Sequence, residues 1–286
     1  WSSDVCSSDL KNQENYFDGI NETKIYYQTW TPDSPKGLIL VIHGYGEHSG
    51  RYMNVVDTLV PDGYTVWALD NRGHGKSEGR RCHVNRFTDF LEDVQIFEKI
   101  ARGAHPKLPV HVLGHSMGSL IANHYVSSRE AQNYKSLTLS GTGAAPGPAI
   151  NAILVLISNI LSAIVPRLSL ASGLDPNFIS YDQKVVEAYV NDPLVENKIT
   201  TRLGSEMMAS LPKMIPAAAK LEIPTMMQIG SEDESFHPDS WDKLFAAIGV
   251  EDKVFKKYEG CRHEVYNEIK KEVPLGDLKE WLNKHN

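Results

Sequence analysis

The stretch Val110-His111-Val112-Leu113-Gly114-His115-Ser116-Met117-Gly118 decides the fold of this chain. A short apolar run ends in a G-x-S-x-G motif, and a helical pattern follows from Leu120 to Ser128. In this context a serine nucleophile sits on a strained bend between a strand and a helix, and small flanking residues let the backbone fold tightly. The motif therefore predicts that Ser116 is a nucleophile. A serine that only caps the helix is the structural alternative.

Further apolar runs flank this stretch and alternate with helical patterns. Unbroken apolar runs of this length are typical of strands in a sheet that is covered on both faces. The expected strands are Leu38–Ile42, Tyr64–Leu69, Val110–Leu113, Leu137–Leu139, Pro224–Ile229 and Lys253–Tyr258, after a hairpin within Tyr16–Trp30. The expected helices are Tyr52–Val60, Phe87–Arg102, Leu120–Ser128 and Leu278–Asn283. This alternation predicts an α/β fold with a mainly parallel central sheet, helices on both faces, and ligands beyond the carboxyl ends of the strands.

The alternation stops in the middle of the chain, which predicts an inserted helical lid. We expect the α/β core to comprise residues 11–142 and 222–286, and the lid to comprise residues 143–221. Residues 1–10 repeat Ser-Ser-Asp and resemble a translated adapter, so we interpret them as a non-native leader. They lie outside the residues that the structure describes.

Composition excludes several classes of function. The chain has 286 residues and a formal net charge of −7, without a run of Lys or Arg, which argues against a nucleic-acid partner. Its three cysteines lack the spacing of a zinc site and favour a reducing compartment. Since no secretory signal is visible, we expect a cytoplasmic protein that touches membranes peripherally. The oligomeric state is not specified by the sequence.

A serine nucleophile needs a histidine base and an acid that orients it. His263 follows the last expected strand and is the preferred base, with His237 as its competitor and His285 as a solvated terminal residue. Asp233 follows the strand Pro224–Ile229 and is the preferred acid, although spacing alone leaves Glu232 open. The order Ser, Asp, His along the chain is that of the α/β-hydrolases.

The oxyanion formed in such a reaction needs two N–H donors. The bend at Ser116, which we call the elbow, provides the N–H of Met117. The glycine-rich loop His43-Gly44-Tyr45-Gly46, after the expected strand Leu38–Ile42, provides the N–H of Tyr45. An ordinary glycine turn is the alternative for this loop. The predicted mechanism needs no metal and no organic cofactor.

Three segments carry a resemblance to a known family: His43 to Tyr52, Asp70 to Ser77, and the elbow Gly114 to Gly118. Together with Gly230-Ser231-Glu232-Asp233 and the segment Tyr258 to Glu264, they closely resemble the monoacylglycerol lipase and lysophospholipase family, from about Tyr16 onward. Two positions depart from the pattern, since Tyr45 is large where a small residue is common and Ser119 stands where another glycine is common.

The resemblance implies an α/β-hydrolase fold and a serine esterase that acts on single-chain lipid esters such as monoacylglycerols. Its triad would fall on Ser116, Asp233 and His263, and its oxyanion donors on Tyr45 and Met117. It further implies a glycerol pocket at Glu47, Arg51, His115 and Tyr189. An ion pair between Glu47 and Arg51 that merely fixes the loop is the alternative. A lysophospholipase, a short-chain carboxylesterase and an inactive binding module on the same fold also stay open.

The charge-free segment Ile150–Val165 lies within the expected lid. It is short for a membrane span, and Asn151, Ser158 and Ser162 form a narrow polar strip on a wide apolar helix. We expect it to cover an acyl tunnel and to contact a membrane or micelle surface transiently, with core packing as the alternative. Asn151 lies outside the described residues.

Overall fold

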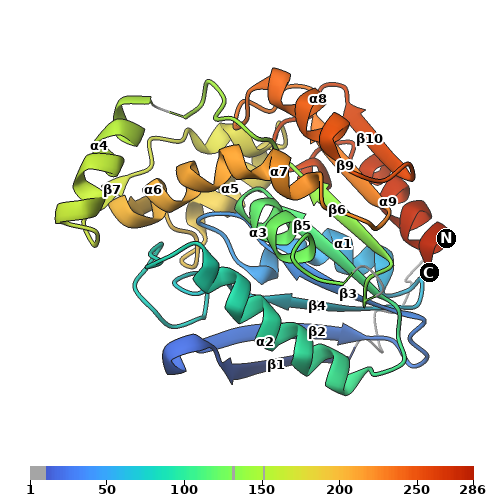
Figure 1. Ribbon diagram of the computed structural model, residues 1–286. Coiled ribbons are helices and arrows are strands. Elements are labelled where there is room, and N and C mark those ends of the chain that lie inside the picture. Colours follow the sequence, from blue (N-terminus) through green and yellow to red (C-terminus); the bar gives the residue numbers. More distant parts are fainter. Residues whose placement is uncertain (1–10, 131–132, 151) are drawn as a thin grey trace.

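The computed structural model describes residues 11–130, 133–150 and 152–286. Eight strands of these residues form one sheet in the order β1-β2-β4-β3-β5-β6-β9-β10 (Figure 1). The pairs β1–β2 and β2–β4 are antiparallel and the other pairs are parallel, which confirms the predicted mainly parallel sheet. The strands are β1 (Lys11–Asp18), β2 (Lys24–Thr31), β3 (Gly37–Ile42), β4 (Tyr64–Leu69), β5 (Val110–His115), β6 (Ser136–Ser140), β9 (Thr225–Gly230) and β10 (Lys253–Tyr258).

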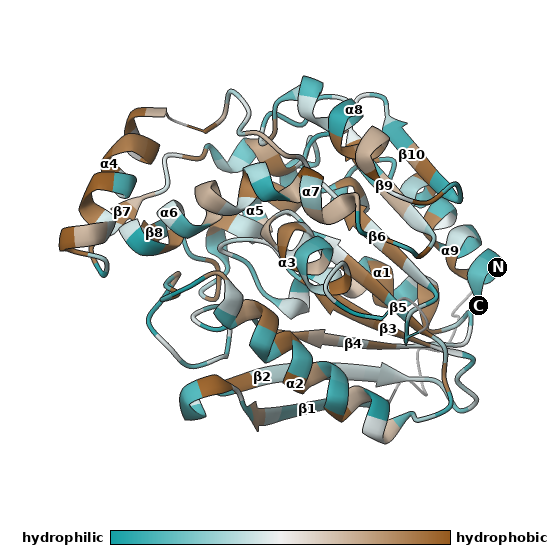
Figure 2. Cartoon of the chain, viewed as in Figure 1, coloured by the Kyte–Doolittle hydropathy of each residue, from teal (hydrophilic) through white to brown (hydrophobic). Residues whose placement is uncertain are grey.

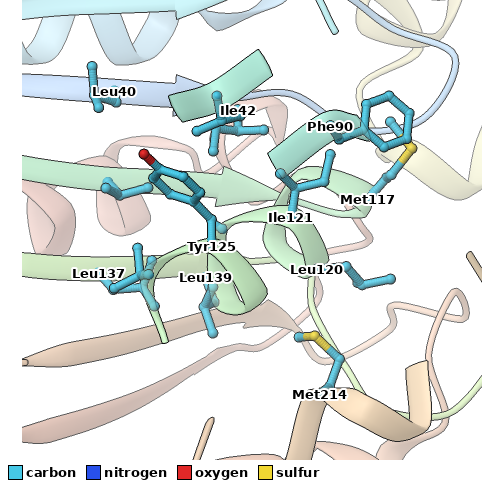
Figure 3. Packing of buried hydrophobic residues seen from close by; sticks show 14 of the residues in the cluster. Leu40, Ile42, Phe90, Met117, Leu120, Ile121, Tyr125, Leu137, Leu139 and Met214 are labelled. Carbon is cyan, nitrogen blue, oxygen red and sulfur yellow. The ribbon is translucent and has the colours of Figure 1, made fainter. Parts of the chain in front are cut away.

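Helices cover both faces of the sheet because its central strands are apolar on both sides. In β3, Leu38, Leu40 and Ile42 join one buried cluster, whereas Ile39 and Val41 join the other. The first cluster packs under α2 (Thr88–Ala104), α3 (Met117–Val126) and α8 (Pro238–Ala247), and the second under α1 (Met53–Leu59) and α9 (Glu272–His285). Figure 3 shows the first cluster, in which side chains of α3 lie between β3 and β6. This packing fixes α3, and with it the elbow at its start.

Residues 143–221, between β6 and β9, hold several small elements and are here called the cap segment; Leu203, Leu211, Met214 and Ala218 of this segment join the first buried cluster of the core. Its elements are α4 (Ala152–Ile164), β7 (Ser169–Ala171), α5 (Gln183–Asn191), β8 (Lys198–Thr200), α6 (Thr201–Ser210) and α7 (Met214–Ala218). β7 and β8 pair antiparallel with each other, apart from the main sheet. In Figure 1, α4 and α6 project at one end of the molecule, away from the chain termini.

Several boundaries differ from the sequence-based expectation. α3 begins at Met117 rather than at Leu120, because the elbow leads directly into the helix and Gly118 is part of it. α9 begins at Glu272, with Pro274 in its first turn, where a missing N–H costs nothing. The expectation that His285 is solvated was wrong: its side chain is 8% exposed and bonds to the carbonyl of Trp281 and to Asp252.

Candidate active site

Ser116 lies on a sharp bend between β5 and α3. Its φ of 53° and ψ of −121° are unusual for a residue other than glycine. Conformations of this kind cost on the order of 1–3 kcal/mol and persist where the surrounding structure enforces them. The N–H of Ser116 donates to the carbonyl of Ser140 at the end of β6, at 3.0 Å. Because the Ser116 side chain makes no capping hydrogen bond to α3, the helix-cap alternative does not explain this serine.

The two glycines of the motif are required by close backbone approach. A Cβ atom added to Gly114 would lie 2.4 Å from the carbonyl oxygen of Gly118. A Cβ atom added to Gly118 would lie 2.0 Å from the carbonyl oxygen of Ile42 in β3. Both distances are far below a van der Waals contact, so only glycine lets α3 start this close to the sheet.

Asp233 and His263 form a buried pair at the ends of neighbouring strands. Asp233 follows β9 and His263 follows β10, each side chain is at most 4% exposed, and Nδ1 of His263 lies 2.8 Å from Oδ2 of Asp233. The second carboxylate oxygen accepts the N–H of Ser235 at 2.8 Å. Burial alone would lower the pKa of His263, but the Asp233 carboxylate raises that pKa above its ordinary value. Burial would raise the pKa of Asp233, but His263 holds it below its usual range. The pair is therefore suited to carry a proton on the imidazole.

The competing base and acid lie elsewhere. His237 caps α8, where it accepts the N–H of Asp239 at 3.3 Å, and its side chain is 54% exposed. Glu232 is exposed and accepts a hydrogen bond from the hydroxyl of Tyr181. Neither is a partner of His263, so the geometry selects Asp233 and His263 from the alternatives that the sequence left open.

Ser116 and His263 line the same cavity, of about 130 Å³. This is roughly ten times the space that one water molecule needs. No hydrogen bond joins the Ser116 hydroxyl to His263 within the described ranges, which is common at catalytic pairs before substrate binds. The apolar part of the lining comes mostly from the cap segment. It consists of Met117, Leu120, Pro146, Ile150, Val155, Leu174, Phe178, Ile179, Ile199, Met207, Met208, Leu211 and Phe236.

The two candidate oxyanion donors, Tyr45 and Met117, line this cavity beside Ser116. No acceptor from the described residues takes the N–H of Tyr45 or of Met117. Gly44 lies directly against Ser116, because a Cβ atom on Gly44 would be 3.0 Å from Cβ of Ser116. Two free N–H groups next to a serine can receive the negative charge of a tetrahedral intermediate.

His43 braces the loop that carries Tyr45. Its Nδ1 donates to the carbonyl of Gly44 at 2.7 Å, and its Nε2 accepts the N–H of Asn71 at 2.8 Å. The side-chain amide of Asn71 also donates to the carbonyl of His43, at 3.1 Å. Complete burial lowers the pKa of His43 to about 3, so the ring stays neutral and keeps both hydrogen bonds.

Glu47 connects the same loop to a buried charge cluster. Its Oε1 accepts the N–H of Gly44 at 2.6 Å and the hydroxyl of Tyr52 at 2.9 Å, while Oε2 lies 3.2 Å from Nη1 of Arg51. Arg51 in turn makes two hydrogen bonds to Glu264, at 2.6 and 2.8 Å. Burial raises the pKa of Glu47, whereas Arg51 holds the pKa of Glu264 below its usual range. Since these contacts occupy the side chains, the geometry favours the loop-fixing alternative for Glu47 and Arg51.

The other two candidates for a glycerol pocket lie at the edge of this cluster. Tyr189 of α5 packs its ring on the guanidinium of Arg51, at 4.6 Å from the ring centroid. His115 packs against His263 with ring centroids 4.8 Å apart, and burial lowers its pKa to about 3. Both residues line the cavity. Sequence reasoning missed Glu264 as the main partner of Arg51, although the residue follows His263 directly.

Residues 11–130, 133–150 and 152–286 hold no group of three or more His, Cys, Asp or Glu side chains arranged to bind a metal ion. None of the helices within those ranges combines the length and the apolar character that crossing a bilayer requires.

The chain is similar to known proteins in both sequence and structure. The family model described as "Serine aminopeptidase, S33" matches residues 33–270. The monoacylglycerol lipase of Mycolicibacterium smegmatis is 34% identical over 274 residues, which cover 95% of this chain and 97% of that protein. Phospholipase YtpA of Bacillus subtilis is 30% identical over 85% of this chain and 94% of that protein. The crystal structure of Paleococcus ferrophilus monoacylglycerol lipase superposes with a TM-score of 0.82 at 29% identity, covering 92% of this chain and 99% of that one.

Proposed function

Because this chain belongs to the serine aminopeptidase S33 family of α/β-hydrolases, among its monoacylglycerol lipases and lysophospholipases, we propose that it hydrolyses monoacylglycerols through an acyl-serine intermediate. Family and relatives together make it a hydrolase of lipid esters. One observation supports the finer assignment: His263, which is joined to the buried Asp233 at 2.8 Å, lines the same cavity as Ser116.

The proposed reaction begins when Oγ of Ser116 attacks the ester carbonyl and His263 accepts its proton. Asp233 holds the ring and stabilises the imidazolium that forms. The N–H groups of Tyr45 and Met117 receive the oxyanion. His263 then protonates the leaving alcohol, and water hydrolyses the acyl-enzyme by the same steps in reverse.

The charges that line the cavity favour a neutral head group. The charged side chains among its described lining residues are Glu47 and Glu264, and the lining contains no Lys or Arg. The nearby Arg51 already binds both carboxylates. A phosphate at this position would face negative charge without a free cation, whereas an uncharged glycerol would meet no such repulsion. Glycerol esters are therefore preferred over lysophospholipids in this proposal.

The cap segment supplies a surface for contact with lipid. α4 is charge-free, and Leu156, Ile160 and Ile164 on it are 60%, 57% and 74% exposed. Figure 2 shows α4 as a largely hydrophobic helix at the end of the molecule. Its polar Ser158 and Ser162 are buried instead, so the helix turns its apolar side outward. We propose that this face rests on a membrane or micelle while substrate enters, as interfacial helices do.

A substrate profile tests the assignment. Purified protein is assayed with a monoacylglycerol, the lysophospholipid of the same acyl chain, and a series of p-nitrophenyl esters of increasing chain length. We expect the monoacylglycerol and the longer esters to give the highest kcat/KM, and Ser116→Ala to abolish turnover. A maximum at the shortest esters would make the protein a short-chain carboxylesterase, and turnover of the lysophospholipid alone would make it a lysophospholipase.

A further inference from the structure

The loop that carries His263 is attached to the cap segment by its backbone. This loop follows β10, comprises residues 259–264 and is here called the His263 loop. The N–H of Glu264 donates to the carbonyl of Ile179 at 2.8 Å, and the N–H of His263 donates to the carbonyl of Phe178 at 3.4 Å. The ring of Phe178 also packs against the imidazole, with centroids 5.3 Å apart. The position of His263 therefore depends on residues of the cap segment.

One buried side chain, Glu268, joins the same two segments. The residue is 2% exposed. Its Oε1 accepts the N–H of Arg262, the residue before His263, at 2.7 Å. Its Oε2 accepts the hydroxyl of Ser180 at 3.0 Å and the N–H of Tyr181 at 3.1 Å, both in the cap segment. Glu268 thus bonds to the His263 loop and to the cap segment at once.

The partners of Glu268 explain why a carboxylate suits this position. A carboxylate donates nothing and accepts about four hydrogen bonds, whereas a glutamine amide has a single acceptor oxygen. Because a buried carboxylate is stable only where donors surround it, Glu268 favours the arrangement in which the cap segment contacts the His263 loop. Its donors are the N–H groups of Arg262, Tyr181 and Ile269 and the hydroxyl of Ser180.

The cap residues that Glu268 holds also reach the loop of the acid. The hydroxyl of Tyr181 donates to the side chain of Glu232, the residue before Asp233. The N–H of the same tyrosine donates to Glu268. Residues 178–181 therefore contact the loops of both His263 and Asp233, and Glu268 lies at the centre of these contacts.

We propose that Glu268 is a positioning residue, which ties residues 178–181 to the His263 loop and so holds the imidazole between Asp233 and the cavity. Glu268 is not among the residues that line the cavity, and it acts through the backbone of Arg262 and through the cap segment. This inference rests on the proposed function, because it takes His263 to be the base of the reaction.

The test compares two buried glutamates. Glu268→Ala and Glu268→Gln are set against the same changes at Glu98 of α2, which accepts the hydroxyls of Tyr125 and Tyr134. Neither Glu98 nor these tyrosines line the cavity. The readout is kcat and KM for p-nitrophenyl butyrate, with folding checked by thermal unfolding of each preparation. Stability should fall in all four variants, whereas kcat should fall only in those of Glu268.

The expected size of the effect follows from how strongly catalysis depends on position. A displacement of about 1 Å costs on the order of 100-fold in rate, so we expect Glu268→Ala to lower kcat by about that factor. Glu268→Gln keeps an acceptor oxygen and should lower kcat only about tenfold. KM should change less than about twofold, because substrate binding does not involve Glu268.

The proton shared by Nδ1 of His263 and Asp233 gives a readout that needs no turnover. A proton in such a hydrogen bond resonates far downfield in ¹H NMR spectra, and its loss in Asp233→Asn assigns the signal. We expect the signal in wild type and in both Glu98 variants, and its loss or broadening in Glu268→Ala. If wild type shows the signal but hydrolyses no ester, the proposed function fails, and the signal still tests the role of Glu268.

Two results would overturn this role of Glu268. One is a folded Glu268→Ala or Glu268→Gln protein whose kcat is no lower than that of the matched Glu98 variant. The other is a downfield signal of wild type that persists unchanged in Glu268→Ala. If Glu268→Ala does not fold, the comparison of Glu268→Gln with Glu98→Gln decides.

Discussion

Replacing Glu47 with alanine should reduce catalysis on every ester, because Glu47 holds the loop that carries an oxyanion donor. The variant leaves the N–H of Gly44 and the hydroxyl of Tyr52 without their acceptor, and both groups are buried. Each buried unsatisfied group costs about 1–3 kcal/mol, and relief of the repulsion between Glu47 and Glu264 offsets part of that cost. We expect the free energy of unfolding to fall by about 2 kcal/mol.

The same change should lower kcat/KM about 100-fold, the lower end of what losing one oxyanion donor costs. Tyr45 follows Gly44 directly, so a shift of Gly44 misplaces the N–H of Tyr45. The assay compares a monoacylglycerol with the p-nitrophenyl ester of the same acyl chain. A loop-fixing role predicts equal loss on both substrates, whereas a glycerol contact predicts loss on the monoacylglycerol alone. Glu47→Gln keeps an acceptor oxygen and should recover part of the activity.

The reasoning about the loop would be refuted by a folded Glu47→Ala protein that cleaves the p-nitrophenyl ester at the wild-type rate. Folding is checked by thermal unfolding of the same preparation. If only the monoacylglycerol reaction is slowed, Glu47 belongs to a glycerol pocket, as the family resemblance implied.

The remaining predictions concern the base, the elbow and the cap segment. Since the pKa of His263 is raised and the base must be neutral, kcat/KM of wild type should rise with pH through a value above 6.5, the ordinary value for histidine. Asp233→Asn should lower kcat about 10⁴-fold and shift the rise of kcat/KM to lower pH. A rise at the wild-type pH would mean that Asp233 does not set the pKa of His263. Gly118→Ala should destabilise the fold by about 1–3 kcal/mol or more, measured by urea unfolding, because its Cβ atom would lie 2.0 Å from the carbonyl oxygen of Ile42. Ile160→Glu should reduce sedimentation with phospholipid vesicles while leaving the hydrolysis of a water-soluble ester intact, and unchanged sedimentation would remove α4 as the contact surface.

The core strands could be predicted from the sequence because their apolar runs are unbroken. β3, β4 and β10 begin and end within one residue of the expected ranges. Ser116, Asp233 and His263 could be proposed because they follow β5, β9 and β10 in turn. Parallel strands bring their carboxyl ends to the same edge of the sheet. Asp233 was preferred from the sequence, but spacing alone left Glu232 open, and the burial of Asp233 that separates the two carboxylates is not visible in the sequence.

The cap segment and the charge cluster were less accessible to sequence reasoning. β7 and β8 have three residues each, too few for a recognisable alternation of side chains. The sequence showed a narrow polar strip on α4 but not the side to which it turns: Ser158 and Ser162 are buried, and Leu156, Ile160 and Ile164 are exposed. The ion pair between Arg51 and Glu264 joins residues far apart in sequence, and no local sequence pattern predicts such a contact.

The most direct test of the central claim is to react the protein with a fluorophosphonate probe and to locate the adduct by mass spectrometry of its peptides. We predict one adduct, on Ser116, that is lost in Ser116→Ala while the variant stays folded. Labelling at another residue, or hydrolysis that survives in Ser116→Ala, would contradict the assignment of Ser116 as the nucleophile.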